Sequence, residues 1–223
     1  MRLAKKYFPI IIAVISLACL LSCQKEASRV ISSKIVYTDI IPDTIVSNPD
    51  RTFTNWGIYN LDLDKDGVND FTFECTFGKG RCMGSNYATF RFWATVMVKP
   101  AENSLNEILN SVDSDLDTSP AALDSLATIS STSVYWRYYS YGPLIFSSHC
   151  LARATDEKFG NWSNGKDKYL GLKLLKGTQV FYGWIRLNVW ASPVVENDPG
   201  VLEVKEYAYN SSPNEPILAG QKE

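Results

Sequence analysis

Four aspartates, Asp62, Asp64, Asp66 and Asp70, lie close together in the chain, with Gly67 between the third and the fourth. Numbered from Asp62, the carboxylates occupy positions 1, 3, 5 and 9 and the glycine occupies position 6, which is the spacing of calcium-binding loops. Carboxylates this close together repel one another unless a cation lies among them. Gly67 can adopt the positive φ of a sharp bend. This segment therefore predicts a Ca²⁺ site.

The backbone carbonyl of Val68 is the expected ligand at position 7. Position 12, however, is Phe73, and the nearest glutamate, Glu74, comes one residue later. The residues from Phe71 to Phe77 alternate between apolar and polar types, which predicts a half-buried strand and not the helix of an EF-hand. The loop resembles the strand-bounded Asp-x-Asp-x-Asp-Gly loops of secreted bacterial β-proteins, in which the metal is structural. The alternative is a solvated, aspartate-rich turn between two strands.

The start of the chain has the composition of an export signal. Basic residues among the first six are followed by an uncharged, largely apolar run from residue 7 to residue 21. This run is shorter than the roughly 20 residues that span a bilayer as a helix, and it fits a signal peptide. It ends in Leu20-Leu21-Ser22-Cys23, which resembles the lipobox of bacterial lipoproteins. An ordinary secretory signal with a chance cysteine is the alternative.

The lipobox resemblance implies that the signal peptide, residues 1–22, is removed and that Cys23 is acylated. Several acyl chains would attach the protein stably to a membrane. Residues 23–34 then form a lipidated tether, and residues 35–223 form one domain. Gln24 stands where inner-membrane lipoproteins carry a retention aspartate, so the expected location is the bacterial outer membrane. Gln24-Lys25-Glu26 also resembles the charged surface-export signal that some Gram-negative lipoproteins carry after the cysteine.

Three cysteines remain in the mature chain after Cys19 leaves with the signal and Cys23 receives lipid. They are Cys75, Cys82 and Cys150, an odd number in an oxidising compartment. Cys75 and Cys82 flank a glycine-bearing segment, so a turn there would close a short disulfide loop. Pairing of either of them with Cys150 is also open.

Composition and motifs narrow the classes of function. The net charge of −2 and the pI near 5.5 provide no basic surface for nucleic acid. The single histidine, His149, leaves no His-rich zinc site. The sequence also lacks a Gly-x-Ser-x-Gly elbow, a His-Glu-x-x-His motif and a phosphate-binding glycine loop. We therefore predict no catalytic residues, although carboxylates from different strands could still form a hydrolase site.

The fold prediction is all-β, an antiparallel two-sheet sandwich of the jelly-roll kind. Strand-like runs, rich in aromatic and β-branched residues, cover residues 55–61, 71–77, 87–98, 167–174, 181–189 and 201–209. A short helical insertion is expected near residues 102–128. Leu105, Ile108, Leu109 and Val112 have helical spacing there, and Ser119-Pro120 resembles a helix start.

The densest aromatic segment extends from residue 133 to residue 141. On an exposed strand, such rings could stack on sugars and form a glycan platform. The alternative is that alternate rings face the core, as is common in sheet proteins. The candidate platform residues are Tyr135, Trp136, Arg137, Tyr138, Tyr139 and Tyr141.

Four C-terminal blocks carry a family resemblance: residues 169–173, 182–187, 206–209 and 216–220. The second, Tyr-Gly-Trp-Ile-Arg-Leu, is the most specific. Together with the aspartate loop, these blocks resemble a family of exported bacterial β-sandwich proteins, many of them anchored at the cell surface. The resemblance implies a fold and an export route but no activity. Arg186 in the second block is expected to pair with a carboxylate such as Glu206, and ligand binding is the alternative.

These features together predict a calcium-stabilised, lipid-anchored binding or adhesion module of the cell surface. Its partners would be the membrane, through the lipid on Cys23, and a glycan or a surface protein. One alternative is a glycoside hydrolase or lyase of the jelly-roll kind. Another is a structural subunit of an outer-membrane complex.

Overall fold

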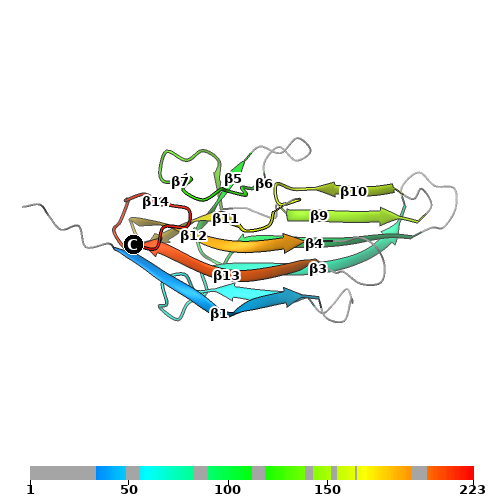
Figure 1. The fold of residues 1–223 in the computed structure, drawn as a ribbon, viewed down its shortest axis with the longest axis horizontal. Helices are drawn as coiled ribbons and strands as arrows, with labels where there is room; N and C mark the ends of the chain where they lie inside the picture. Colours follow the sequence, from blue (N-terminus) through cyan, green and yellow to red (C-terminus); the bar gives the residue numbers. More distant parts are fainter. Residues whose placement is uncertain are drawn as a thin grey trace, which may run out of the picture. The chain divides into compact units, whose positions relative to one another are not determined.

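The computed structural model describes residues 34–48, 56–82, 90–111, 119–138, 143–151, 155–163, 165–191 and 200–223 (Figure 1). All of them belong to one compact unit, Lys34–Glu223. The predicted signal peptide, Cys23 and most of the tether lie outside the described residues, as do Tyr139 and Tyr141. The described part contains no helix with the length and apolar character needed to cross a membrane.

The described chain is all-β, as predicted, and its strands pair antiparallel. The strands are β1 (Ile35–Ser47), β2 (Gly57–Leu61), β3 (Phe71–Arg81), β4 (Phe90–Pro100), β5 (Glu107–Ser111), β6 (Ser119–Pro120), β7 (Thr128–Ile129), β8 (Trp136–Arg137), β9 (Pro143–Cys150), β10 (Thr155–Phe159), β11 (Lys168–Lys176), β12 (Gln179–Trp190), β13 (Val201–Asn210) and β14 (Ile217–Leu218).

Three sheets result (Figure 1). A seven-stranded sheet has the order β1-β13-β12-β11-β5-β6, and β8 also pairs with β5. A five-stranded sheet has the order β10-β9-β4-β3-β2, and β14 pairs with β7 in a small third sheet. Many neighbouring strands are also consecutive in sequence, whereas the pairings of β1 with β13, β5 with β11 and β4 with β9 join distant parts of the chain.

The two large sheets share one hydrophobic core. Alternating residues of each strand point into it, because successive side chains in a strand face opposite ways. The five-stranded sheet contributes Phe71, Phe73, Cys75, Ala94, Val96, Val98 and Ile145, and the seven-stranded sheet contributes Ile108, Leu170, Leu172, Leu174, Ile185, Leu187, Leu202 and Val204.

The opposite face of the seven-stranded sheet is also covered by apolar groups. Trp184 is fully buried there, and Tyr169 meets its ring edge-on at 5.3 Å between centroids. Ile129 of β7 and Ile217 of β14 pack on the same cluster, so the small sheet covers this face. The central strands of the seven-stranded sheet are thus buried on both faces.

The helical insertion predicted near residues 102–128 is wrong for the described part of that range, which contains β5, β6 and β7 and no helix. Ile108 points into the shared core, whereas Leu109 packs over Gly171 on the other face. Both faces of β5 are covered, so the adjacent residues Ile108 and Leu109 are both apolar. In the sequence this pair produces the spacing that is typical of a helix. Leu105, which a helix would have buried, is 68% exposed.

The disulfide joins Cys82 and Cys150, with their Cα atoms 5.7 Å apart, and Cys75 is a buried free thiol. The predicted Cys75–Cys82 pair is therefore wrong, and one of the open alternatives is correct. The predicted turn between them is absent because β3 runs through it. Seven residues of strand separate the two cysteines by roughly 23 Å, too far for a disulfide.

The free thiol yields a prediction about labelling and pH. Burial raises the pKa of Cys75 from 9.0 to about 12. The folded protein therefore keeps this proton where the unfolded chain loses it, so the contribution to stability is complete below about pH 9 and declines as the pH rises toward 12. An alkylating agent at pH 8 should leave Cys75 unmodified in the folded protein and modify it in denaturant.

Peptide mapping by mass spectrometry measures the labelling, and Cys82 and Cys150 serve as internal controls because they should react only after reduction. Urea unfolding at pH 8 and pH 10.5 measures the stability change, which should be smaller in Cys75→Ala. Rapid labelling of Cys75 in the folded state, or a Cys75–Cys82 disulfide peptide, would contradict this assignment.

Candidate metal centre

The aspartate loop connects β2 to β3 and is closed at its base by the pairing of Leu61 with Phe71. The backbone N–H of Asp70 donates to the carbonyl of Leu61 at 2.8 Å. Lys65 and Gly67 both have positive φ, at 61° and 87°, and these two residues turn the chain back on itself. The bend at Gly67 is the one that the sequence predicted.

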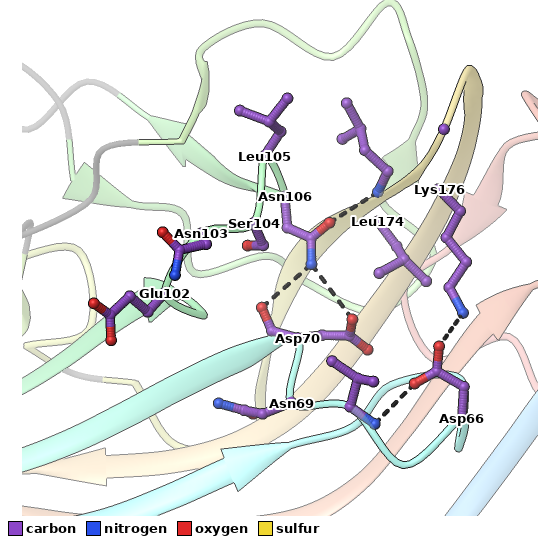
Figure 2. A pocket seen from close by; sticks show the side chains of 13 residues that line it. Asp66, Asn69, Asp70, Glu102, Asn103, Ser104, Leu105, Asn106, Leu174 and Lys176 are labelled. Carbon is purple, nitrogen blue, oxygen red and sulfur yellow. Dashed lines mark hydrogen bonds and ion pairs between the residues drawn. The ribbon is translucent and has the colours of Figure 1, made fainter.

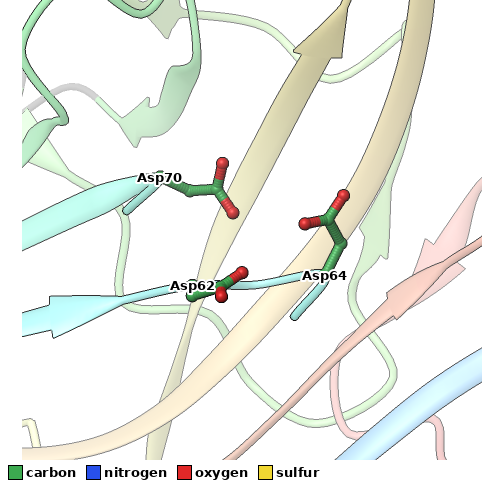
Figure 3. A group of neighbouring side chains, drawn as sticks. All are labelled: Asp62, Asp64 and Asp70. Atoms are coloured by element: carbon green, nitrogen blue, oxygen red, sulfur yellow. The ribbon is translucent and has the colours of Figure 1, made fainter. Parts of the chain in front are cut away.

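Three of the predicted ligands come together. One carboxylate oxygen from each of Asp62, Asp64 and Asp70 lies within 4.8 Å of the others. Figure 3 shows the three side chains converging from the two ends of the loop. The side chains of Asp64 and Asp70 are deeply buried, 9% and 6% exposed. The strand register thus holds three like charges together in a site that is partly closed to water.

Backbone hydrogen bonds fix two of these carboxylates. Asp62 accepts from the N–H groups of Asp66 at 3.1 Å and Gly67 at 2.8 Å. Asp70 accepts from the N–H of Leu63 at 2.8 Å. Asp64 differs, because its Oδ1 atom is buried and has no hydrogen-bond partner among the described residues. A buried carboxylate oxygen without a partner carries a large desolvation cost.

The electrostatic state of Asp70 reflects the same crowding. Burial, together with the charges of Asp64, Asp66 and Asp62, raises the pKa of Asp70 to about 6, and the Leu63 hydrogen bond opposes this shift only in part. A cation among the carboxylates would offset both causes of the raised pKa. Its positive charge would counter the repulsion between the aspartates, and its coordination would replace the water that burial removes.

Asp66 does not join the cluster of three. The carboxylate of Asp66 accepts from the N–H of Val68 at 2.9 Å and pairs with the Lys176 ammonium at 2.6 Å. The hydrogen bond from Lys176 is the largest effect that lowers the pKa of Asp66. The structure therefore assembles Asp62, Asp64 and Asp70 of the predicted ligand set and places Asp66 beside them.

Lys176 is a member of this site that the sequence did not predict. It ends β11, and its ammonium pairs with both Asp64 and Asp66 (Figure 2 shows the pair with Asp66). Burial alone would lower the pKa of Lys176, but the two aspartates raise it above its ordinary value. It lies more than a hundred residues away in sequence, so no local pattern identifies it.

Asn106, a second unpredicted member, supports Asp70 from the other side. Its amide nitrogen donates to the backbone and side-chain oxygens of Asp70 at 3.3 and 3.4 Å, and its oxygen accepts from the N–H of Leu175 at 2.9 Å. These residues lie on one wall of a pocket of about 470 Å³ beside the loop (Figure 2). The pocket gives solvent access to the edge of the cluster.

Glu74 does not replace the missing ligand at position 12. It lies on β3, and its carboxylate pairs with Lys99 of the neighbouring strand β4 at 2.5 Å. The three side chains that converge at the loop, Asp62, Asp64 and Asp70, offer carboxylate oxygens. This set fits a hard cation such as Ca²⁺, with water or carbonyl oxygens completing six to eight ligands.

One member of the predicted aromatic platform, Trp136, packs against the domain. The ring of Trp136 packs on Tyr182 at 5.8 Å, and its indole N–H donates to the carbonyl of Ser130 at 3.1 Å. Trp136 thus belongs to the covered face of the seven-stranded sheet. Tyr135, Arg137 and Tyr138 are exposed, and they are the part of the predicted platform that faces solvent among its described residues.

The predicted pairing of Arg186 is confirmed. Arg186 and Glu206 are opposite each other on β12 and β13, and their side chains meet at 3.2 Å. Burial alone would raise the pKa of Glu206, but hydrogen bonds from Lys222, Tyr37 and Arg186 lower it. Arg186 also pairs with Asp167 at 2.9 Å. These contacts give Arg186 a structural role between strands.

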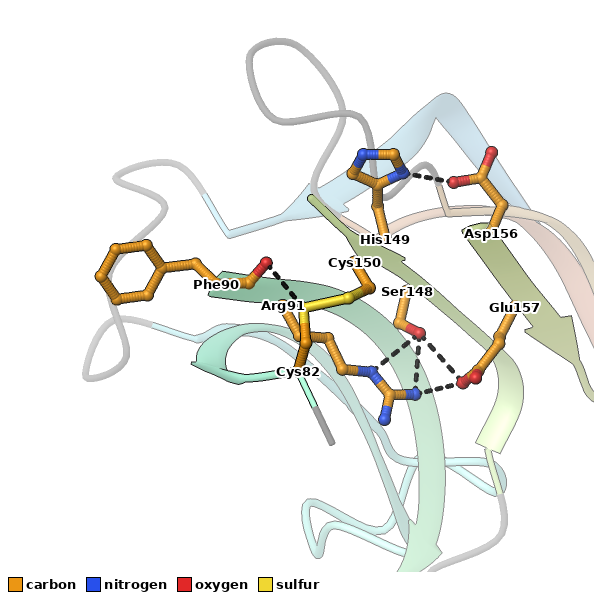
Figure 4. Close-up of a disulfide and its surroundings, with 8 residues drawn as sticks. All are labelled: Cys82, Phe90, Arg91, Ser148, His149, Cys150, Asp156 and Glu157. Atoms are coloured by element: carbon orange, nitrogen blue, oxygen red, sulfur yellow. Dashed lines mark hydrogen bonds and ion pairs between the residues drawn. A yellow bond between two sulfur atoms is a disulfide. The ribbon is translucent and has the colours of Figure 1, made fainter. Parts of the chain in front are cut away.

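The groups around the disulfide do not form a nucleophilic constellation (Figure 4). Cys150 is consumed in the disulfide, so it has no thiol to pair with His149. His149 contacts Asp156 at 2.6 Å, whereas the adjacent Ser148 contacts Arg91 on the opposite face of the strand. Ser148 and His149 therefore point away from each other.

Comparisons with known protein families, with curated proteins and with solved structures gave no significant match. The resemblance to exported bacterial β-sandwich proteins therefore stays a prediction.

Lys176 is the positive charge of the site, so its removal should expose the repulsion between the aspartates. In buffer containing a chelator, Lys176→Met should lower the free energy of unfolding by about 1 kcal/mol, the upper range for partly exposed ion pairs. Lys176→Arg, which keeps the charge, is the matched control. Urea unfolding checks this, and a Lys176→Met protein as stable as wild type would show that the lysine does not offset the charge.

Proposed function

We propose that this chain is a calcium-stabilised, lipid-anchored binding module of the bacterial cell envelope, located at the outer membrane. We also infer that its two large sheets form a jelly-roll-like sandwich, which the shared hydrophobic core supports. The proposal has two independent parts, a cation site in the domain and an anchor at Cys23.

The observation that carries the cation site is the buried Oδ1 of Asp64, which lacks a partner among the described residues within a group of three carboxylates. A solvated turn, the alternative, would direct its carboxylates to water. Here Asp64 and Asp70 are instead packed inside the domain. The metal would act as a structural clamp between β2 and β3, because strands and not helices flank the loop.

Calcium should raise the melting temperature of the wild-type protein above its value in chelator. Because calcium would bind only the folded state, it should raise the free energy of unfolding by about 2.7 kcal/mol when its free concentration is a hundredfold above its dissociation constant. Asp64→Asn should lose this response, whereas Asp43→Asn, at an exposed aspartate of β1, should keep it. Lys176→Met should bind calcium more tightly than wild type because the competing ammonium is gone.

Isothermal titration calorimetry measures the affinity directly, so a change in folding does not obscure the result. A wild-type protein that releases or absorbs no heat with calcium, and whose melting temperature is the same in calcium and chelator, would contradict the cation site.

The anchor is supported by the sequence Leu20-Leu21-Ser22-Cys23 after an apolar run. Expressed in a Gram-negative host, the wild-type protein should incorporate an alkyne-labelled fatty acid and sediment with the outer membrane. Cys23→Ser should take up no label and appear in the soluble fraction, and Cys19→Ser is the control that should behave as wild type. Labelling of Cys23→Ser equal to wild type would rule out acylation at this residue.

A further inference from the structure

The outer face of the five-stranded sheet carries an aromatic surface that the proposed metal site does not use. The register aligns side chains of β3, β4, β9 and β10 in cross-strand rows, and the members of a row share one face. Two neighbouring rows on the outer face are Gly78, Trp93, Ser148 and Glu157, and Thr76, Thr95, Phe146 and Phe159.

Trp93 lies flat across the backbone of β3. A Cβ atom placed on Gly78 would be 2.0–2.2 Å from three atoms of the indole, and one on Gly80 would be 3.0 Å from a fourth. The two glycines therefore make room for the ring to lie against the strand. One face of the indole covers the glycines, and the other is directed away from the sheet.

Two further rings extend this surface. Phe146 and Phe159 stack across β9 and β10 with centroids 4.5 Å apart and an interplanar angle of 12°. The guanidinium of Arg91 lies 5.7 Å from the Phe146 centroid. Trp93 and Phe146 occupy adjacent rows on neighbouring strands, a diagonal spacing of about 7 to 8 Å. Trp93, Phe146 and Phe159 thus lie on one face of the sheet, on three neighbouring strands.

The charges on this face cancel locally. Arg91 pairs with Glu157 and also donates to Ser148, as Figure 4 shows, and Lys99 pairs with Glu74 at 2.5 Å. Two acids and two bases are the charged groups that the described strands β2, β3, β4, β9 and β10 place on this face. An electrically balanced aromatic surface complements a neutral ligand and offers no net attraction to phosphate groups or to an acidic chain.

The three rings of this face are half-buried and its two edges are exposed, whereas the shorter side chains between them are buried: Thr76 is 9%, Thr95 is 7% and Ser148 is 1% exposed. Ile58 of β2 is 54% exposed on one edge, and the side chain of Glu157 is 60% exposed on the other. The small sheet of β7 and β14 covers the seven-stranded sheet instead, and the described residues place no other strand over this face.

We propose that the outer face of β3, β4, β9 and β10 binds a neutral polysaccharide. Trp93, Phe146 and Phe159 would stack on the apolar faces of successive sugar rings, and Arg91 and Glu157 would exchange hydrogen bonds with their hydroxyl groups. This inference rests on the proposed binding function and names its ligand class and site. It differs from the sequence prediction, which placed the platform at residues 135–141.

The same Trp93 contact has a structural effect that a test must separate from binding. An aromatic ring laid over glycine stabilises a sheet. Trp93→Leu keeps an apolar cover over Gly78 but removes the flat aromatic face. Phe146→Leu makes the equivalent change on β9, which provides a second variant should Trp93→Leu fold poorly.

The experiment is affinity electrophoresis of the full-length protein in detergent, through gels containing starch, mixed-linkage β-glucan, xylan or galactomannan. At least one of these should retard the wild-type protein. Trp93→Leu and Phe146→Leu should weaken that retardation at least tenfold while their melting temperatures stay close to wild type. Tyr138→Ala, on the segment that the sequence suggested, should bind as wild type does.

Three results would overturn the inference. The first is passage of the folded wild-type protein through all four gels without retardation. The second is binding that survives in Trp93→Leu and Phe146→Leu and is lost in Tyr138→Ala, which would place the site elsewhere. The third is a dimer, detected by light scattering, that Trp93→Leu abolishes, which would make the face an interface between two copies of the protein. Each result leaves the calcium and acylation tests of the proposed function to be decided separately.

Discussion

The repulsion among Asp62, Asp64 and Asp70 is the constraint on which this account depends. The register of β2 and β3 brings their oxygens within 4.8 Å of one another. Each pair of full charges at that distance repels by about 3.5 kcal/mol at an effective dielectric constant near 20. Lys176 offsets part of this repulsion from one side, and it leaves Oδ1 of Asp64 without a partner in the described structure. A divalent ion would satisfy all three carboxylates at once.

The repulsion also explains why the loop draws on distant parts of the chain. Asn106 precedes β5 and fixes Asp70, while Lys176 ends β11 and reaches Asp64. Because β5 pairs with β11, both supports come from the same sheet and approach the loop of the other sheet together. The aspartate cluster therefore contacts residues of both large sheets, and a cation bound there should affect the stability of the whole domain more than the local order of one turn.

Local patterns predicted much of this structure. Alternation after Asp70 identified β3, aromatic and β-branched runs identified β4, β12 and β13, and the aspartate spacing identified three residues that do converge. The errors have physical causes. Ile108 and Leu109 imitate helical spacing because both faces of β5 are covered. The segment around Gly78 reads as a turn, although its glycines instead accommodate Trp93 from the next strand. Lys176, Asn106 and the Cys82–Cys150 bond depend on long-range pairing, which no short window of sequence contains.

The most direct test of the central claim is a high-resolution crystal structure of the protein grown with calcium. We predict a metal ion with oxygens of Asp62, Asp64 and Asp70 at about 2.3–2.6 Å, the usual range for calcium, and with the Lys176 ammonium moved away from Asp64. Water alone among the three carboxylates, with Lys176 still paired to Asp64 at saturating calcium, would contradict this prediction.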